Sequence, residues 1–159
     1  MANLFKPSEI LKIALRIEEN GREYYLEAKE RASTPEMADL FGFLADEEVR
    51  HLEVFSKMLS DVGKEKFPES YPGEHDAYIR ALAAGHVFTG DAVGKDMVAK
   101  AKDEKEILKF ALGFEKDSIL LYYEMLDLVP ASKKEVVEEV IREEKSHVRK
   151  LNEIRDSIR

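Results

Sequence analysis

Residues 37–59 read MADLFGFLADEEVRHLEVFSKML, and this stretch has the periodicity of an amphipathic helix. Side chains three, four and seven positions from Glu48 lie on the same helical face. On that face Glu48 and His51 stand among Phe, Leu and Ala side chains. A carboxylate in an apolar stripe is costly unless it is protonated, paired or bound to a cation. The stretch therefore predicts a buried acid and a neighbouring imidazole that need a partner from elsewhere in the chain.

Three more apolar faces each carry one acid in the middle. Hydrophobic periodicity predicts long helices over residues 8–32, 34–61, 103–129 and 132–157. Ser8 and Thr34 are expected as N-caps of the first two, and the Ser132–Glu135 spacing predicts a capping box for the last. The central acids of the other three helices are Glu18, Glu115 and Glu144, and His147 follows Glu144 by three residues as His51 follows Glu48.

The order of these helices predicts a single all-α domain over residues 1–159. Two helical hairpins are joined by a long crossover, residues 62–102, which Pro and Gly residues break into short helical pieces near 74–84 and 91–101. The midpoint between the two acids of each hairpin falls at its predicted turn, at Ser33–Thr34 or at Pro130. The four acids are therefore expected at one level of a four-helix bundle.

A Glu from each of two helices and Glu-x-x-His from the other two is the ligand set of a di-metal carboxylate site. Four carboxylates and two neutral imidazoles balance the charge of two divalent cations. Oxygen and nitrogen ligands without thiolate suit iron or manganese and tolerate zinc. The metal ligands are thus predicted to be Glu18, Glu48, His51, Glu115, Glu144 and His147. The adjacent Glu47 and Glu143 are expected to face solvent, and the alternative is that each orients a His across the bundle.

The motifs IEENGREYY (residues 17–25) and LADEEVRH (residues 44–51) resemble the ferritin-like di-iron proteins, and the rubrerythrin branch in particular. The resemblance spans all four long helices and implies a ferritin-like bundle with two iron ions that reacts with hydrogen peroxide or dioxygen. Two features depart from rubrerythrins. The chain has no Cys and so lacks the Cys₄ rubredoxin module, and Ser118 stands where rubrerythrins place a further Glu.

The expected activity is that of a rubrerythrin-like peroxide reductase, an oxidoreductase that receives electrons from an external donor protein. Glu48 and Glu144 would bridge the two irons. Tyr25 and Tyr122 each follow a predicted ligand by seven residues, and either steady a carboxylate or serve as ordinary core aromatics. Three alternatives stay open at this point: a ferroxidase or iron-storage protein, a manganese catalase or oxygenase on the same scaffold, and a metal-free buried network.

Composition excludes several other classes of protein. A net charge of −8 with acids and bases interspersed argues against nucleic acid as a partner. No stretch approaches the roughly 18 apolar residues of a membrane span, and the N-terminus has no signal-peptide pattern. The absence of Cys favours a reducing compartment, and a cytoplasmic protein is expected. Resemblance to ferritin-like chains implies a homodimer.

Overall fold

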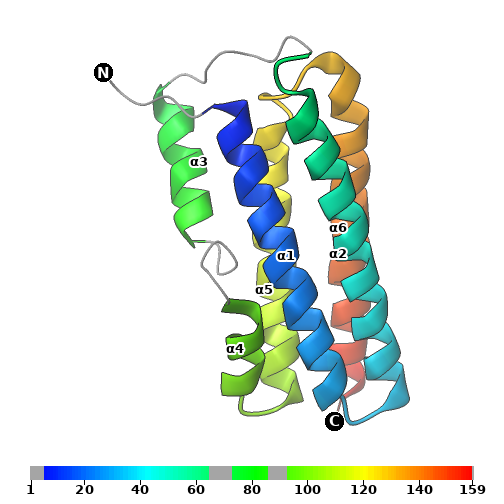
Figure 1. Ribbon diagram of the computed structural model, residues 1–159. Helices are drawn as coiled ribbons and strands as arrows, with labels where there is room; N and C mark the ends of the chain where they lie inside the picture. The colour runs from blue at the N-terminus through cyan, green and yellow to red at the C-terminus, as the bar shows by residue number, and fades with distance from the viewer. Residues whose placement is uncertain (1–5, 65–72, 86–92, 159) are drawn as a thin grey trace.

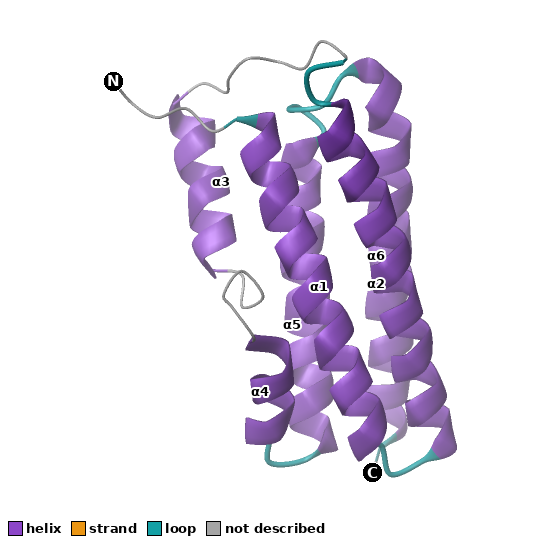
Figure 2. Cartoon of the chain, in the orientation of Figure 1, coloured by secondary structure: helices purple, strands orange, loops and turns teal. Residues whose placement is uncertain are grey.

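The computed structural model describes residues 6–64, 73–85 and 93–158, and every regular element in these ranges is a helix (Figure 2). The six helices are α1 (Pro7–Arg31), α2 (Pro35–Asp61), α3 (Gly73–Gly85), α4 (Val93–Lys100), α5 (Glu104–Met125) and α6 (Ala131–Ser157). The all-α prediction is confirmed. Within the described ranges, no helix combines the length and hydrophobicity needed to cross a membrane.

The long helices form the predicted bundle of two hairpins (Figure 1). Helices α1 and α2 run antiparallel, as do α5 and α6, whereas α2 and α5 point in the same direction. Two consecutive long helices that run in the same direction need a connection that returns along the whole bundle. That connection contains α3 and α4, and α4 packs against α1 while α3 contacts α5. Ile79 of α3 and Val98 of α4 are fully buried, so the crossover adds to the same core.

The helix starts differ from prediction at two of three N-caps. Thr34 caps α2 as expected, since its hydroxyl accepts a hydrogen bond from the Met37 backbone N–H at 3.2 Å. Helix α1 begins at Pro7 rather than after Ser8, because the fixed φ of proline suits the first helical position. The predicted capping box of α6 is wrong. That helix begins at Ala131 with Pro130 as its N-cap and no side-chain cap.

Helix α5 ends at Met125, earlier than the predicted residue 129. The chain tightens there into short-range turns, and the Leu128 N–H donates to the Met125 carbonyl at 2.9 Å. A residue before proline is pushed away from the helical region, so Val129 cannot continue the helix into Pro130. The turn brings Leu128 and Val129 into the core, where both are buried.

Gly94 sets how closely α4 approaches α1. A Cβ atom at this position would lie 2.2 Å from the Asn20 carbonyl oxygen and 3.0 Å from the Tyr24 backbone nitrogen. Gly94→Ala is therefore expected to force the two helices apart and to lower the free energy of unfolding by about 1–3 kcal/mol. Gly113→Ala is the control, because a Cβ there meets nothing within 4 Å. It should stabilise α5 by about 0.5–1 kcal/mol. Urea unfolding measures both changes, and equal effects of the two substitutions would contradict the close packing.

Candidate metal centre

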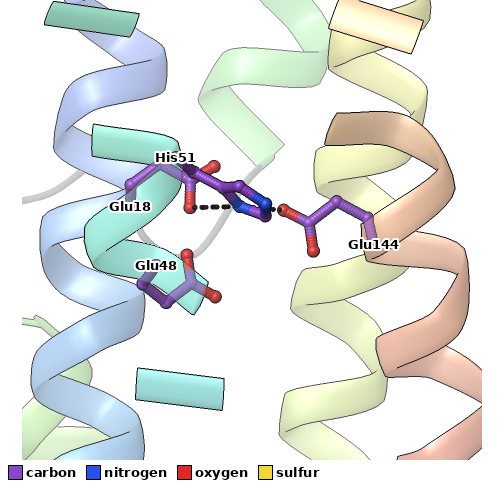
Figure 3. Close-up of side chains that lie close together, drawn as sticks. All are labelled: Glu18, Glu48, His51 and Glu144. Atoms are coloured by element: carbon purple, nitrogen blue, oxygen red, sulfur yellow. Dashed lines mark ion pairs between the residues drawn. The ribbon is translucent and has the colours of Figure 1, made fainter. Parts of the chain in front are cut away.

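Four carboxylates and two imidazoles converge at the middle of the bundle. Helix α1 supplies Glu18, α2 supplies Glu48 and His51, α5 supplies Glu115, and α6 supplies Glu144 and His147. All six side chains are buried, with relative exposures between 1% and 5%. Figure 3 shows Glu18, Glu48, His51 and Glu144 pointing toward one another from α1, α2 and α6. The structure thus brings together every side chain that the sequence predicted as a ligand.

The six residues form two groups that overlap. One group contains Glu18, Glu48, His51 and Glu144, and the other contains Glu48, Glu115, Glu144 and His147. Within each group, one nitrogen or oxygen atom per residue lies within 4.8 Å of all the others. Glu48 and Glu144 belong to both groups. Two adjacent cation positions that share two carboxylates have this arrangement.

Glu144 presents one carboxylate oxygen to each histidine. Its Oε1 lies 3.2 Å from Nδ1 of His51, and its Oε2 lies 2.9 Å from Nδ1 of His147. The terminal acids complete the pattern, since Oε2 of Glu18 is 3.4 Å from His51 Nδ1 and Oε2 of Glu115 is 3.6 Å from His147 Nδ1. Each imidazole therefore faces the cluster through Nδ1, between a shared and an unshared carboxylate.

Two buried atoms in the first group are placed to bind a cation. Glu18 Oε2 and His51 Nδ1 have no hydrogen-bond partner among the described residues. Buried polar atoms without partners are rare and costly. Metal–oxygen and metal–nitrogen bonds are each about 2.0–2.2 Å long, so the 3.4 Å separation of these two atoms matches two ligands of one ion. The residues present fit a bound divalent metal.

The charges in the cluster shift the pKa values of its members. Burial raises the pKa of Glu48 well above its ordinary value, and neighbouring carboxylates raise it further. Burial and the adjacent Glu144 raise the pKa of Glu115 to about 8. Burial lowers the pKa of His147, but contacts with Glu115 and Glu144 outweigh it and raise the value to about 10. Without a metal, the cluster therefore holds several protons at neutral pH that a cation would displace.

Two tyrosines bind the terminal carboxylates across the bundle. The Tyr25 hydroxyl on α1 donates a hydrogen bond to Glu115 Oε1 on α5, and the Tyr122 hydroxyl on α5 donates to Glu18 Oε1 on α1. Burial and the nearby acids raise the pKa of both phenols well above the usual range, so both stay protonated donors. Each phenol occupies Oε1 and leaves Oε2 directed at a histidine. Of the two roles that the sequence left open, the structure places both tyrosines against the acids.

The prediction that Glu47 and Glu143 face solvent is wrong. Glu143 Oε2 lies 2.9 Å from Nε2 of His51, across the bundle from its own helix. Glu47 is 9% exposed, and its Oε2 lies 3.8 Å from Nε2 of His147. Arg50 joins the two acids, with Nη1 2.7 Å from Glu47 Oε1 and Nη2 2.9 Å from Glu143 Oε1. We call Glu47, Glu143 and Arg50 the outer triad.

A carboxylate on the far nitrogen of an imidazole fixes its tautomer and leaves the near nitrogen free to bind a metal. Glu143 therefore orients His51 so that Nδ1 faces the cluster. A signal for this role was present in the sequence, because the pattern Glu-Glu-x-x-His occurs in both hairpins, at residues 47–51 and 143–147. The helical period placed the first Glu of each pair on the polar side of its helix. It could not show that α2 and α6 lie close enough for that Glu to reach a histidine on the other helix.

A small cavity borders the cluster between α1 and α5. Its volume is about 10 Å³, and its lining includes Gly21, Tyr25, Glu48, Glu115 and Ser118. This is close to the room that one water molecule needs. A Cβ at Gly21 would lie 3.2 Å from the Glu48 carboxyl carbon, so the glycine keeps space beside that carboxylate.

Fold and site together define a ferritin-like protein with a candidate di-metal carboxylate centre. The chain belongs to the rubrerythrin family, whose sequence pattern it matches over residues 9–155. A solved structure from Thermotoga maritima, assigned as a ferritin-like diiron-carboxylate protein, is similar to it with a TM-score of 0.75 and 32% sequence identity. That similarity covers 99% of each chain. No curated protein sequence matches this one.

Proposed function

We propose that this protein is a di-iron peroxide reductase that draws electrons from an external donor. The observation that carries the proposal is the pair of overlapping ligand groups, joined through Glu48 and Glu144 at the centre of the bundle. In this assignment Glu48 and Glu144, which belong to both groups, would help to hold both ions. Glu18 and His51 would hold one ion, and Glu115 and His147 would hold the other.

The donor set favours a redox-active metal, iron or manganese, and we assign iron. Four carboxylates and two imidazoles without thiolate suit iron and manganese better than copper. When bound, a pair of ferrous ions would supply the two electrons that reduce hydrogen peroxide, with two protons, to two molecules of water. The rest of the chemistry belongs to the protein, which must bind, orient and protect this centre.

The protein's own side chains hold the ligands in place. Tyr25 and Tyr122 fix one oxygen of each terminal carboxylate, which keeps the second oxygen directed at the metal position. Glu143 holds the proton on Nε2 of His51 and so keeps Nδ1 available. Hydrogen bonds of this kind orient metal ligands and make them more basic.

The cavity between α1 and α5 points to a small substrate. At about 10 Å³ it has room for about one water molecule, so an organic substrate does not fit there. Ser118 lines this cavity at the position where the family carries a further Glu. Its short side chain leaves the space that a longer carboxylate would fill. On the α1/α5 side of the centre, the size of the cavity therefore favours a small oxidant over an organic molecule.

Peroxide consumption by the iron-loaded protein tests the proposed function. Peroxide should disappear only while a reductant is supplied, with two electrons consumed per peroxide and no oxygen released. Oxygen release without reductant would indicate a catalase instead. Continued iron uptake into large assemblies, sized in solution, would indicate storage.

Replacing either tyrosine with Phe is expected to weaken metal binding at one position only. Tyr25→Phe frees Glu115, and Tyr122→Phe frees Glu18, so each should lower affinity at the adjacent position by about 10- to 100-fold. Tyr24→Phe is the control, because the buried Tyr24 hydroxyl donates to the Ile107 carbonyl, away from the cluster. It should cost about 1 kcal/mol of stability and leave affinity unchanged. Calorimetric titration with Mn²⁺ separates the two outcomes, and equal affinity in all three variants would contradict the orienting role.

A further inference from the structure

A second cavity opens on the opposite side of the metal centre, over the seam between α2 and α6. Its volume is about 170 Å³, and it reaches His51, which is only 1% exposed. The charged residues that line it are Arg50, Glu53, Glu139 and Glu143, and the remaining lining is three valines. Solvent therefore extends to an imidazole whose other nitrogen faces the cluster.

Arg50 and Glu143 of the outer triad line this cavity, and Glu47 and a buried nitrogen without a partner lie beside them. Glu143 contacts His51 Nε2, as described above. Nε2 of His147 has no hydrogen-bond partner among the described residues, and the nearest carboxylate oxygen given for it is Glu47 Oε2 at 3.8 Å. Glu47, Glu143 and His51 also place one ligand atom each within 4.8 Å of one another. Two carboxylates and Nε2 of His51 are thus grouped beside the cavity, and Nε2 of His147 lies next to Glu47.

A cation already lies beside Glu47 and Glu143 in the form of the Arg50 guanidinium. Its two nitrogens lie 2.7 and 2.9 Å from the two outer carboxylates. The Arg50 side chain is 56% exposed, however, and an exposed ion pair contributes little to stability. The guanidinium can therefore leave without unfolding its surroundings, and a divalent ion can take its place.

The two cavities are both acidic but differ in size. Glu48 and Glu115 line the α1/α5 cavity, and three carboxylates with one guanidinium line the α2/α6 cavity. A cleft of one charge sign raises the local concentration of the opposite ion and its rate of association. Of these two acidic routes, the α2/α6 cavity is the wider, at about 170 Å³ against about 10 Å³.

We propose that divalent cations reach the metal centre through the α2/α6 cavity and pause at an outer cation site formed by Glu47, Glu143 and Nε2 of His147. Arg50 closes this outer site when no metal passes. The inference rests on the proposed di-metal centre and adds its route of loading. An arriving ion displaces the guanidinium, and the inner carboxylates then draw it past the histidines.

Uptake of Co²⁺ by the metal-free full-length protein tests this route, because bound Co²⁺ absorbs visible light. The double variant Glu53→Gln/Glu139→Gln removes two cavity charges that contact no predicted ligand. Its matched control is Glu23→Gln/Glu30→Gln, which removes the same charge from exposed positions of α1. Arg50→Ala removes the competing guanidinium.

The cavity variant should load about 3- to 10-fold more slowly than the wild type at low ionic strength. Added salt should narrow that difference, and the final stoichiometry should stay at two ions per chain. The α1 control should load at the wild-type rate. Arg50→Ala should load faster, and its crystals in excess Co²⁺ should show a third anomalous peak between Glu47 and Glu143.

Equal loading rates for the wild type, the cavity variant and Arg50→Ala, all ending at two ions per chain, would overturn the route and leave the di-metal centre intact. A wild-type chain that binds no Co²⁺ at all would instead overturn the proposed function. The two failures are therefore distinguishable in one titration.

Discussion

Glu48→Gln is expected to abolish two-metal binding and, at about pH 8, to make the metal-free protein more stable. Glutamine keeps the shape of the protonated acid but removes a bridging anion from both ligand groups. Orienting residues one shell further out already change metal affinity by about 10- to 100-fold, so the loss here should exceed about 100-fold at both positions. Elemental analysis and Mn²⁺ titration measure it.

The gain in stability follows from the raised pKa of Glu48. Folding raises the pKa of this acid, and at pH 8, where the unfolded chain has released the proton, that rise costs free energy. Glutamine removes that cost. A gain of about 1–2 kcal/mol would raise the melting temperature of a chain of this size by about 2–8 °C.

Glu138→Gln on the exposed side of α6 provides the control. It should change neither the metal affinity nor the melting temperature of the metal-free protein. A Glu48→Gln protein that retains two metals, or that melts earlier than the wild type when metal-free at pH 8, would contradict the assignment. Loss of stability would indicate that Glu48 takes part in a structural network and was not kept for metal binding.

Removing the metal is expected to lower stability and to make it strongly dependent on pH. Each ion present at about 1,000 times its dissociation constant stabilises the folded state by about 4 kcal/mol. Chelation should therefore lower the melting temperature by roughly 8–16 °C per ion. The ions stabilise the folded state only, because the ligands lie on four separate helices and come together only when the chain folds.

The sign of the pH dependence follows from the raised pKa values. Glu115 has a pKa of about 8 in the folded chain against an ordinary value of 4.5, and His147 has about 10 against 6.5. Each group is therefore protonated in the folded, metal-free chain over a range where the unfolded chain is not. Its contribution to stability is complete below the ordinary pKa and is lost as pH rises through the folded value.

The melting temperature of the metal-free protein should consequently fall between about pH 6 and about pH 9, whereas that of the metal-loaded protein should change little. Bound cations replace the displaced protons, so metal binding at neutral pH should release protons. Titration calorimetry in buffers of different ionisation enthalpy measures this release. A metal-free protein whose stability rises over this pH range would contradict the buried cluster.

The sequence alone predicted the four-helix bundle and the six inner residues because the same pattern recurs in all four long helices. Glu18, Glu48, Glu115 and Glu144 each interrupt an apolar stripe, and a helix of fixed period leaves an interrupting acid no other direction to face. Matched spacing within the hairpins then placed the four acids at one level. The crossover helices were likewise visible as pieces between Pro and Gly residues.

What the sequence could not give was the distance between helices. Glu47 and Glu143 sit at the edge of their helices, and only the closeness of α2 and α6 turns them toward the histidines. The small cavity beside Ser118 depends on how α1 and α5 pack at Gly21. The predicted ends of the helices were inaccurate for a different reason. Pro7 and Pro130 set the helix boundaries through local backbone geometry, which hydrophobic periodicity does not show.

Anomalous diffraction at the iron edge, from crystals of the iron-loaded protein, tests the central claim most directly. Two peaks should appear about 3.5–4 Å apart, one between Glu18 and His51 and the other between Glu115 and His147, with Glu48 and Glu144 reaching both. A single peak, or iron bound only at the protein surface while the six inner side chains contact one another, would contradict the account.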